Sequence, residues 1–115
     1  RQLLTDCLIA TGMPFGKRIY ENYLKQIDSI SKNSAGIRRL GSAGIDLAYV
    51  AAGKFDGFWE KDLNLWDVST GVLLVKEAGG KISKIDGKDW SIKSKDILAS
   101  NLLINKKLQE KLSLL

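Results

Sequence analysis

The sequence contains no histidine, and it has only one cysteine, one proline and one methionine. Without histidine the chain can form neither a Ser-His-Asp nor a Cys-His catalytic arrangement, and it lacks the commonest zinc ligand. Any chemistry must therefore depend on carboxylates, hydroxyls, backbone groups, lysine or arginine. Carboxylate oxygens favour hard cations such as Mg²⁺.

Long apolar runs are also absent. The longest stretch without a charged residue covers residues 7–16, far short of the ~18 apolar residues that span a bilayer, and no basic and then apolar leader opens the chain. The single Cys7 cannot form an internal disulfide, and the apolar run CLIA indicates a buried, inert thiol. We therefore expect a soluble, cytoplasmic protein. Because Met13 is the only methionine, we also expect a fragment of a longer chain.

The charge is positive but dispersed. The formal net charge of +5 comes from 18 basic and 13 acidic residues, and adjacent basic residues occur only as Lys17-Arg18, Arg38-Arg39 and Lys106-Lys107. None of these pairs alternates with aromatic residues, as a groove for single-stranded nucleic acid requires. The pattern therefore disfavours nucleic-acid binding.

The order of apolar patterns predicts a single α/β domain over residues 1–115. Strand signals occur at 7–10, 37–40, 56–60, 81–85 and 96–100, and helix signals from Pro14 to about residue 30 and at 42–53, 66–78 and 104–115. Strands that alternate with helices indicate a sheet covered by helices. The helix at 42–53 is almost wholly apolar, so we expect it to be buried, and Asp86-Gly87 predicts a hairpin turn.

A lone carboxylate, Asp67, stands at the start of the predicted helix at 66–78, whose first turn also contains Ser69, Thr70 and Gly71. It can accept hydrogen bonds from free backbone N–H groups, and the helix dipole favours its charge. The small residues also leave room for a phosphate near those N–H groups, where a carboxylate can hold a cation. Spacing alone favours a capping role for Asp67 over a role as a metal ligand.

Two other features have two readings each. Glu60 ends an aromatic strand seven residues before Asp67, so it is either a pocket residue that faces Asp67 or a strand-end surface charge. The Gly41-Ser42 dipeptide opens a helix and is either a cap or a substrate-facing backbone.

Asp46 is the only charged residue between positions 43 and 52. A buried carboxylate needs a partner, because the ionised group loses its hydration. We therefore favour a structural ion pair with Arg38 or Arg39 over a ligand role.

Residues 41–82, GSAGIDLAYVAAGKFDGFWEKDLNLWDVSTGVLLVKEAGGKI, resemble the C-terminal half of the inositol monophosphatase family, and ATGMPF, ILASN and the closing helix fit the flanks. The motifs are GSA at a helix start, the glutamate that ends DGFWE, and WD and EAGG at the two ends of one helix. The resemblance covers essentially the whole chain. It implies the C-terminal half of a layered sheet-and-helix fold and a magnesium-dependent cytoplasmic phosphatase, usually a homodimer, that hydrolyses inositol monophosphate or similar monoesters.

The resemblance also implies roles for individual residues and reverses the preference at Asp67. Asp67 matches the family's metal-ligating aspartate, Gly41, Ser42 and Ala43 match the segment that contacts the substrate, and Glu60 matches the acidic residue that binds a ring hydroxyl. Asp46 receives no such role. No residue of this segment matches the family's threonine that helps to activate water.

The family's other magnesium ligands belong to its N-terminal half, and no Asp-Pro-x-Asp-Gly-type stretch occurs here. One carboxylate cannot assemble a site for two or three ions. We therefore expect the segment to be inactive alone and to require the N-terminal half of the fold. The alternatives are a noncatalytic module that binds protein or RNA, and a related phosphatase for another sugar, histidinol or nucleotide phosphate.

Overall fold

The computed structural model describes residues 2–12, 17–61 and 65–113, with the backbone alone at 17–21 and 65–67. A 3-10 turn precedes a mixed series of strands and helices, which are η1 (Leu4–Asp6), β1 (Leu8–Thr11), α1 (Lys17–Asn33), β2 (Gly36–Arg38), α2 (Ala43–Ala51), β3 (Gly57–Lys61), α3 (Leu65–Glu77), β4 (Lys81–Ser83), β5 (Asp96–Ser100) and α4 (Asn105–Leu112). The α/β class predicted from the sequence is confirmed. The predicted helix start at Pro14 and the last apolar position, Leu115, lie outside the described residues.

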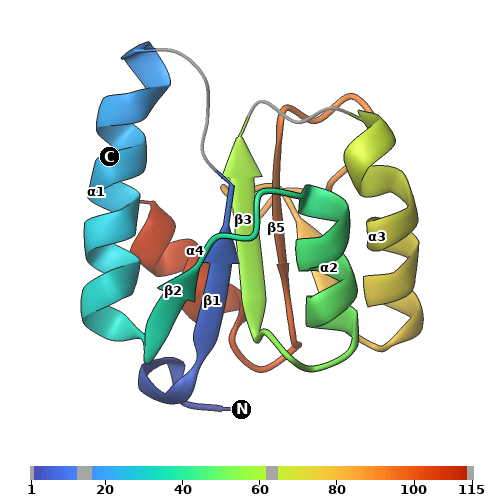
Figure 1. The fold of residues 1–115 in the computed structure, drawn as a ribbon, viewed down its shortest axis with the longest axis horizontal. Helices are drawn as coiled ribbons and strands as arrows, with labels where there is room; N and C mark the ends of the chain where they lie inside the picture. Colours follow the sequence, from blue (N-terminus) through green and yellow to red (C-terminus); the bar gives the residue numbers. More distant parts are fainter. Residues whose placement is uncertain (1, 13–16, 62–64, 114–115) are drawn as a thin grey trace.

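The strands form one sheet in the order β2-β1-β3-β5-β4. Strand β1 pairs in parallel with both β2 and β3, whereas β5 runs antiparallel to β3 and β4. The carboxyl ends of β1, β2 and β3 therefore meet at one edge of the sheet, which is the upper edge in Figure 1. The segments that follow these strands begin at that edge.

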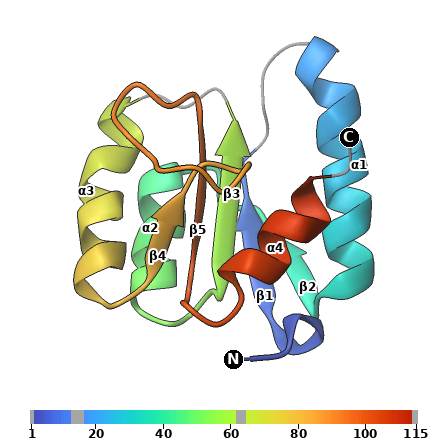
Figure 2. The same ribbon diagram turned by 180° about the vertical axis from the view of Figure 1, so that it is seen from behind.

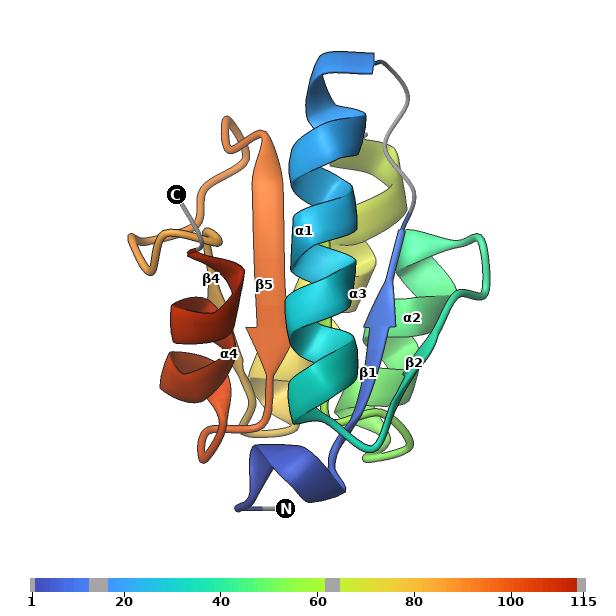
Figure 3. The same cartoon turned by 90° about the vertical axis from the view of Figure 1, so that its left-hand side faces the viewer.

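Helices cover both faces of the sheet. Figures 2 and 3 show α1 and α4 on one face and α2 and α3 on the other. Successive strand residues serve opposite faces: Ile9 and Trp59 pack in the cluster under α1 and α4, and Ala10 and Phe58 pack in the cluster under α2 and α3. The central strands are apolar on both sides because both sides are buried.

Helices α2 and α3 lie in close contact. A Cβ atom added at Gly71 in α3 would lie 2.5 Å from the Cβ atom of Leu47 in α2, which is fully buried. A glycine at this position therefore lets the two helix backbones approach each other. Both helices start at the upper edge of the sheet in Figure 1 and run in the same direction, so their first turns are neighbours.

One sequence prediction about this region needs correction. The helix at 42–53 was expected to be buried, but α2 leaves Ile45 and Tyr49 50% and 41% exposed. Leu73 and Leu74 of α3 are likewise exposed. Only the side of α2 that carries Ala43, Leu47 and Val50 faces the core, because a helix turns its apolar residues in every direction when the whole segment is apolar.

The predicted hairpin at Asp86-Gly87 is wrong, although the turn itself forms. The backbone N–H of Lys84 donates to the carbonyl of Lys88 at 2.9 Å, and Gly87 adopts a φ of +87°. The antiparallel partner of β4 is β5, so residues 84–95 form a long excursion between the two strands. Local turn signals do not reveal which later strand will pair.

No helix in the described part of the chain combines the length and the apolarity that a bilayer crossing requires.

Candidate functional site

The segments that carry the predicted site residues gather at the upper edge of the sheet. Residues 41–43 form the start of α2, Glu60 lies near the end of β3, and Asp67 lies in the first turn of α3. Figure 1 shows the two helix starts beside the end of β3. The structure therefore brings together backbone regions that are up to 26 positions apart in the sequence, from Gly41 to Asp67.

The start of α2 has an open turn and a capped helix. Gly41 adopts a φ of +84°, and a Cβ atom added there would meet nothing within 4 Å. The Oγ atom of Ser42 accepts a hydrogen bond from the backbone N–H of Ile45 at 3.3 Å, so the capping role considered from the sequence is realised. Ala43 is only 7% exposed and packs in the core, so its backbone rather than its methyl group can face a ligand.

We expect Ser42→Ala to lower the free energy of unfolding by about 1 kcal/mol, because the N–H of Ile45 loses its acceptor at the helix start. Ser42→Thr retains the hydroxyl oxygen and serves as the matched control. Denaturant unfolding of the three proteins measures the effect. An alanine variant as stable as the parent would contradict the capping role.

The end of β1 lies tightly against the end of β3. Thr11 pairs with Trp59, and the Trp59 carbonyl accepts hydrogen bonds from Thr11 Oγ1 at 3.1 Å and from the backbone N–H of Gly12 at 3.4 Å. A Cβ atom added at Gly12 would overlap the carboxylate of Glu60. The half-buried Glu60 side chain therefore lies over the backbone of Gly12.

Asp67 is the third residue of α3, which starts at Leu65. In the first turn of a helix, the dipole favours a negative charge, and the same turn favours bound anions. The following Val68 is buried, whereas Ser69 and Thr70 are exposed. The side chain of Asp67 lies outside the described part of the structure, so both the metal ligation and the capping remain predictions.

Among the residues whose side chains are described, no group of three cysteine, aspartate or glutamate residues could hold a metal ion. An oxygen donor in the first turn of α3 nevertheless fits Mg²⁺, which prefers carboxylates and usually retains several waters. Asp67 would hold such an ion only with additional ligands.

The predicted ion pair of Asp46 is wrong. Asp46 is 1% exposed, and within the described residues neither of its carboxylate oxygens has a hydrogen-bond partner. Arg38 instead donates from its guanidinium to the carbonyl of Ile37 at 3.0 Å, and Arg39 is exposed. Asp46 is buried together with Ala43, Leu47 and Val50 of α2, whereas both arginines are exposed. Burial raises the pKa of Asp46 to about 6.

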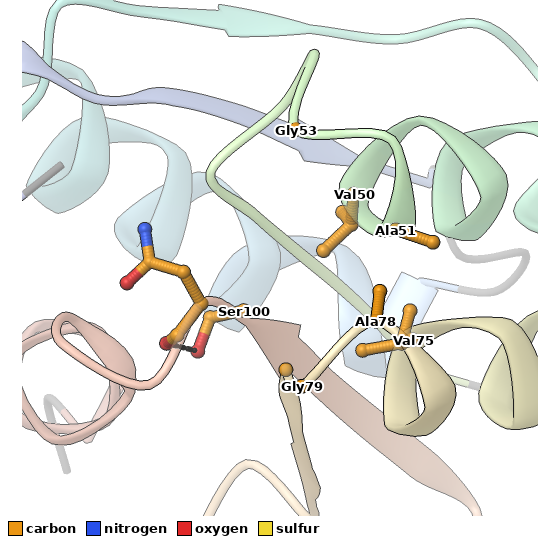
Figure 4. Close-up of a pocket in the computed structure, with 9 residues that line it drawn as sticks. Val50, Ala51, Gly53, Val75, Ala78, Gly79 and Ser100 are labelled. Atoms are coloured by element: carbon orange, nitrogen blue, oxygen red, sulfur yellow. Dashed lines mark hydrogen bonds between the residues drawn. The ribbon is translucent and has the colours of Figure 1, made fainter.

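A cavity that no sequence pattern indicated lies at the opposite edge of the sheet. It has a volume of about 180 Å³ and lies between the last turns of α2 and α3 and the end of β5 (Figure 4). Ser100 Oγ donates to the carbonyl of Asn101, and Asn101 Oδ1 accepts from the N–H groups of Leu103 and Ile104. Because these side-chain oxygens are engaged within the chain, the upper edge is the stronger candidate site.

Comparison with known proteins gives one consistent family. The sequence model of the inositol monophosphatase family matches residues 3–114. The chain is 47% identical over 114 residues to an inositol-1-monophosphatase of Caulobacter vibrioides and 44% identical over 104 residues to Nus factor SuhB of Pseudomonas aeruginosa. These matches cover 97% and 88% of this chain, but 44% and 38% of the relatives. The chain thus spans less than half the length of the curated relatives it matches.

Solved structures agree with the sequence matches. The fold is similar to that of the extragenic suppressor protein suhB from Bartonella henselae, with a TM-score of 0.93, 44% identity and coverage of 99% of this chain and 44% of that one. An inositol monophosphatase from Anabaena gives a TM-score of 0.90, 38% identity and coverage of 97% and 47%. The predicted layered fold is confirmed.

Proposed function

Because the chain belongs to the inositol monophosphatase family, we propose that it is the C-terminal part of a magnesium-dependent phosphatase that hydrolyses a phosphate monoester, with inositol monophosphate as the favoured substrate. The observation that carries the proposal is the meeting of Glu60, the α2 start and the first turn of α3 at one edge of the sheet. The relatives named inositol-1-monophosphatase support it.

Each residue at this edge has a proposed task. The open turn at Gly41 and the backbone of Ser42 and Ala43 approach the substrate, because free N–H groups at a helix start bind phosphate oxygens. The carboxylate of Glu60 accepts a hydrogen bond from a hydroxyl of the leaving alcohol. Asp67, in the first turn of α3, would hold one Mg²⁺. When bound, the ions neutralise charge on the phosphoryl oxygens and the leaving oxygen.

The remaining magnesium ligands are proposed to come from an N-terminal half that this chain does not contain. The relatives are more than twice as long as the matched region. The outer faces of α2 and α3 are also apolar, with Ile45, Tyr49, Leu73 and Leu74 exposed. A further layer of the fold would cover this surface, since burying apolar area away from water is favourable.

We propose that the complete protein is a cytoplasmic homodimer.

We expect the full-length protein to release phosphate from inositol monophosphate when Mg²⁺ is present and to stop when a chelator removes the metal. A colorimetric phosphate assay measures the rate. Fructose bisphosphate, histidinol phosphate and a nucleotide phosphate form the comparison panel, because related enzymes for these substrates are the alternatives within the class. Absence of metal-dependent release from every substrate would contradict the phosphatase proposal.

A second function is favoured by a different observation. Relatives from Pseudomonas aeruginosa and Salmonella typhimurium that are named Nus factor SuhB are 43% to 44% identical to this chain, so a noncatalytic role as a protein- or RNA-binding module is the second proposal. The +5 net charge would assist contact with RNA. RNA binding that weakens steeply with salt, in a protein without phosphatase activity, would support the module.

A further inference from the structure

Gly12 and Glu60 continue the register of two parallel strands. Thr11 pairs with Trp59 at the last step of the β1–β3 ladder, and the N–H of Gly12 still donates to the Trp59 carbonyl. Phe58, two residues before Glu60, packs in the cluster under α2 and α3. Since side chains alternate along a strand, Glu60 projects to the same face, on which both helix starts lie.

The absence of a side chain at Gly12 makes this position of Glu60 possible. A Cβ atom added at Gly12 would overlap the Oε1 atom of Glu60, crowd its Cδ atom and lie 2.9 Å from its Cγ atom. Gly12 is not among the glycines with positive φ, so its backbone conformation is open to any residue. The glycine at position 12 therefore leaves space for the Glu60 carboxylate in its observed place, and backbone freedom is not the reason for it.

A Cβ atom added at Gly12 would crowd only the side chain of Glu60, which can move. Each of the three nearest atoms to the added Cβ belongs to the Glu60 side chain and none to the backbone. An alanine at position 12 can be accommodated when the carboxylate rotates away, whereas the ladder between Thr11 and Trp59 is untouched. The expected result of such a change is a folded protein with a displaced carboxylate.

We propose that Gly12 is a positioning residue that sets the place of the Glu60 carboxylate and, through it, the preference for leaving alcohols that carry a hydroxyl group. This inference depends on the proposed function, in which Glu60 accepts a hydrogen bond from the leaving alcohol. It adds a residue 48 positions away from Glu60 to the determinants of substrate choice.

The test compares two substrates in the full-length protein. Gly12→Ala is expected to raise the KM for inositol monophosphate on the order of tenfold, which corresponds to the loss of one hydrogen bond to a charged group. The kcat/KM for p-nitrophenyl phosphate, whose leaving group has no ring hydroxyl to donate, is expected to stay within about twofold of the parent value. Gly36→Ala is the matched control, because Gly36 lies in β2 of the same sheet and its added Cβ atom would meet flexible side-chain atoms of Arg38 and Leu8.

A double-mutant cycle separates positioning from a general structural effect. In a Glu60→Ala background, Gly12→Ala is expected to have no further effect on either substrate, because the displaced group is gone. Equal losses for both substrates, additive losses in the double variant, or a Gly12→Ala protein that does not fold would each overturn the inference. An unchanged KM for inositol monophosphate would overturn it as well.

A structural readout distinguishes failure of this inference from failure of the proposed function. If the parent protein hydrolyses no phosphate ester, the proposed function fails, and the side-chain ¹³C chemical shift of Glu60 then decides the role of Gly12. A changed shift in Gly12→Ala, with the shift unchanged in Gly36→Ala, supports the positioning of the carboxylate. An identical shift in the parent and Gly12→Ala overturns it.

Discussion

Replacing Asp67 with asparagine is expected to lower the metal-dependent kcat of the full-length protein by roughly a hundredfold or more, because removal of an anionic ligand weakens the electrostatic stabilisation that the ion provides. Asparagine has nearly the same shape as aspartate but lacks its negative charge. Mg²⁺ prefers carboxylate oxygen, so the variant should also need a higher Mg²⁺ concentration for half-maximal activity. Steady-state assays over a range of Mg²⁺ concentrations measure both effects.

The same substitution separates the two roles that the sequence allows for Asp67. At the third position of α3 a negative charge contributes at most about 1 kcal/mol through the helix dipole, so a residue that only stabilises the helix start would tolerate Asp67→Asn with little change in activity. Thr70→Ala is a suitable control, because Thr70 lies three residues after Asp67 in the same helix and is exposed. Near-normal turnover in Asp67→Asn would refute the role of this residue as a metal ligand.

The free energy of unfolding is expected to fall by about 3 kcal/mol as the pH rises from about 4 to above 6, because of Asp46 alone. Burial raises the pKa of this carboxyl from 3.8 to about 6 in the folded protein. Between these two values the folded state binds more protons than the unfolded state, so stability decreases as pH increases. The stabilising contribution of Asp46 is complete below the pKa that this carboxyl has in the unfolded chain. It is lost as the pH rises through the pKa of the same carboxyl in the folded protein.

Asp46→Asn removes the titrating group while keeping its size. We expect the variant to lack this part of the pH dependence and to be more stable than the parent at pH 8, where the parent carries a buried charge without a described partner. Asp28→Asn is the control, because Asp28 is 64% exposed and forms an exposed pair with Lys32 at 2.9 Å, which contributes little. Denaturant unfolding at several pH values measures the difference. Identical pH profiles for Asp46→Asn and the parent would contradict the prediction.

The sequence did not indicate which residues of α2 are buried and which are exposed. Ile45, Leu47 and Tyr49 are all large and apolar, and the sequence alone did not indicate which of them faces the core. The structure buries Leu47 against Gly71 of α3 and exposes the other two. Similarly, the isolated charge at Asp46 correctly indicated burial, but the direction of Arg38 and Arg39 depends on the end of β2, which no local pattern encodes.

The sequence by itself determined the types of local structure and the inventory of chemical groups. Its apolar runs marked the strands, Ser42 marked a helix start, and the lack of histidine restricted the chemistry to carboxylates, hydroxyls and backbone groups. These properties are local, because capping and the alternation of buried side chains depend on neighbours within a few residues. The family motifs at Gly41, Glu60 and Asp67 are equally local.

Only the tertiary structure decided which distant segments meet. Local patterns did not indicate that β4 pairs with β5 across the long segment 84–95. They also did not indicate that Gly71 packs on Leu47 or that Glu60 lies over Gly12. Parallel pairing of β1 with β3 joins positions 48 residues apart, since Thr11 pairs with Trp59. Such pairing arises because a parallel strand must return by a crossover, and the packing of both sheet faces then selects its register.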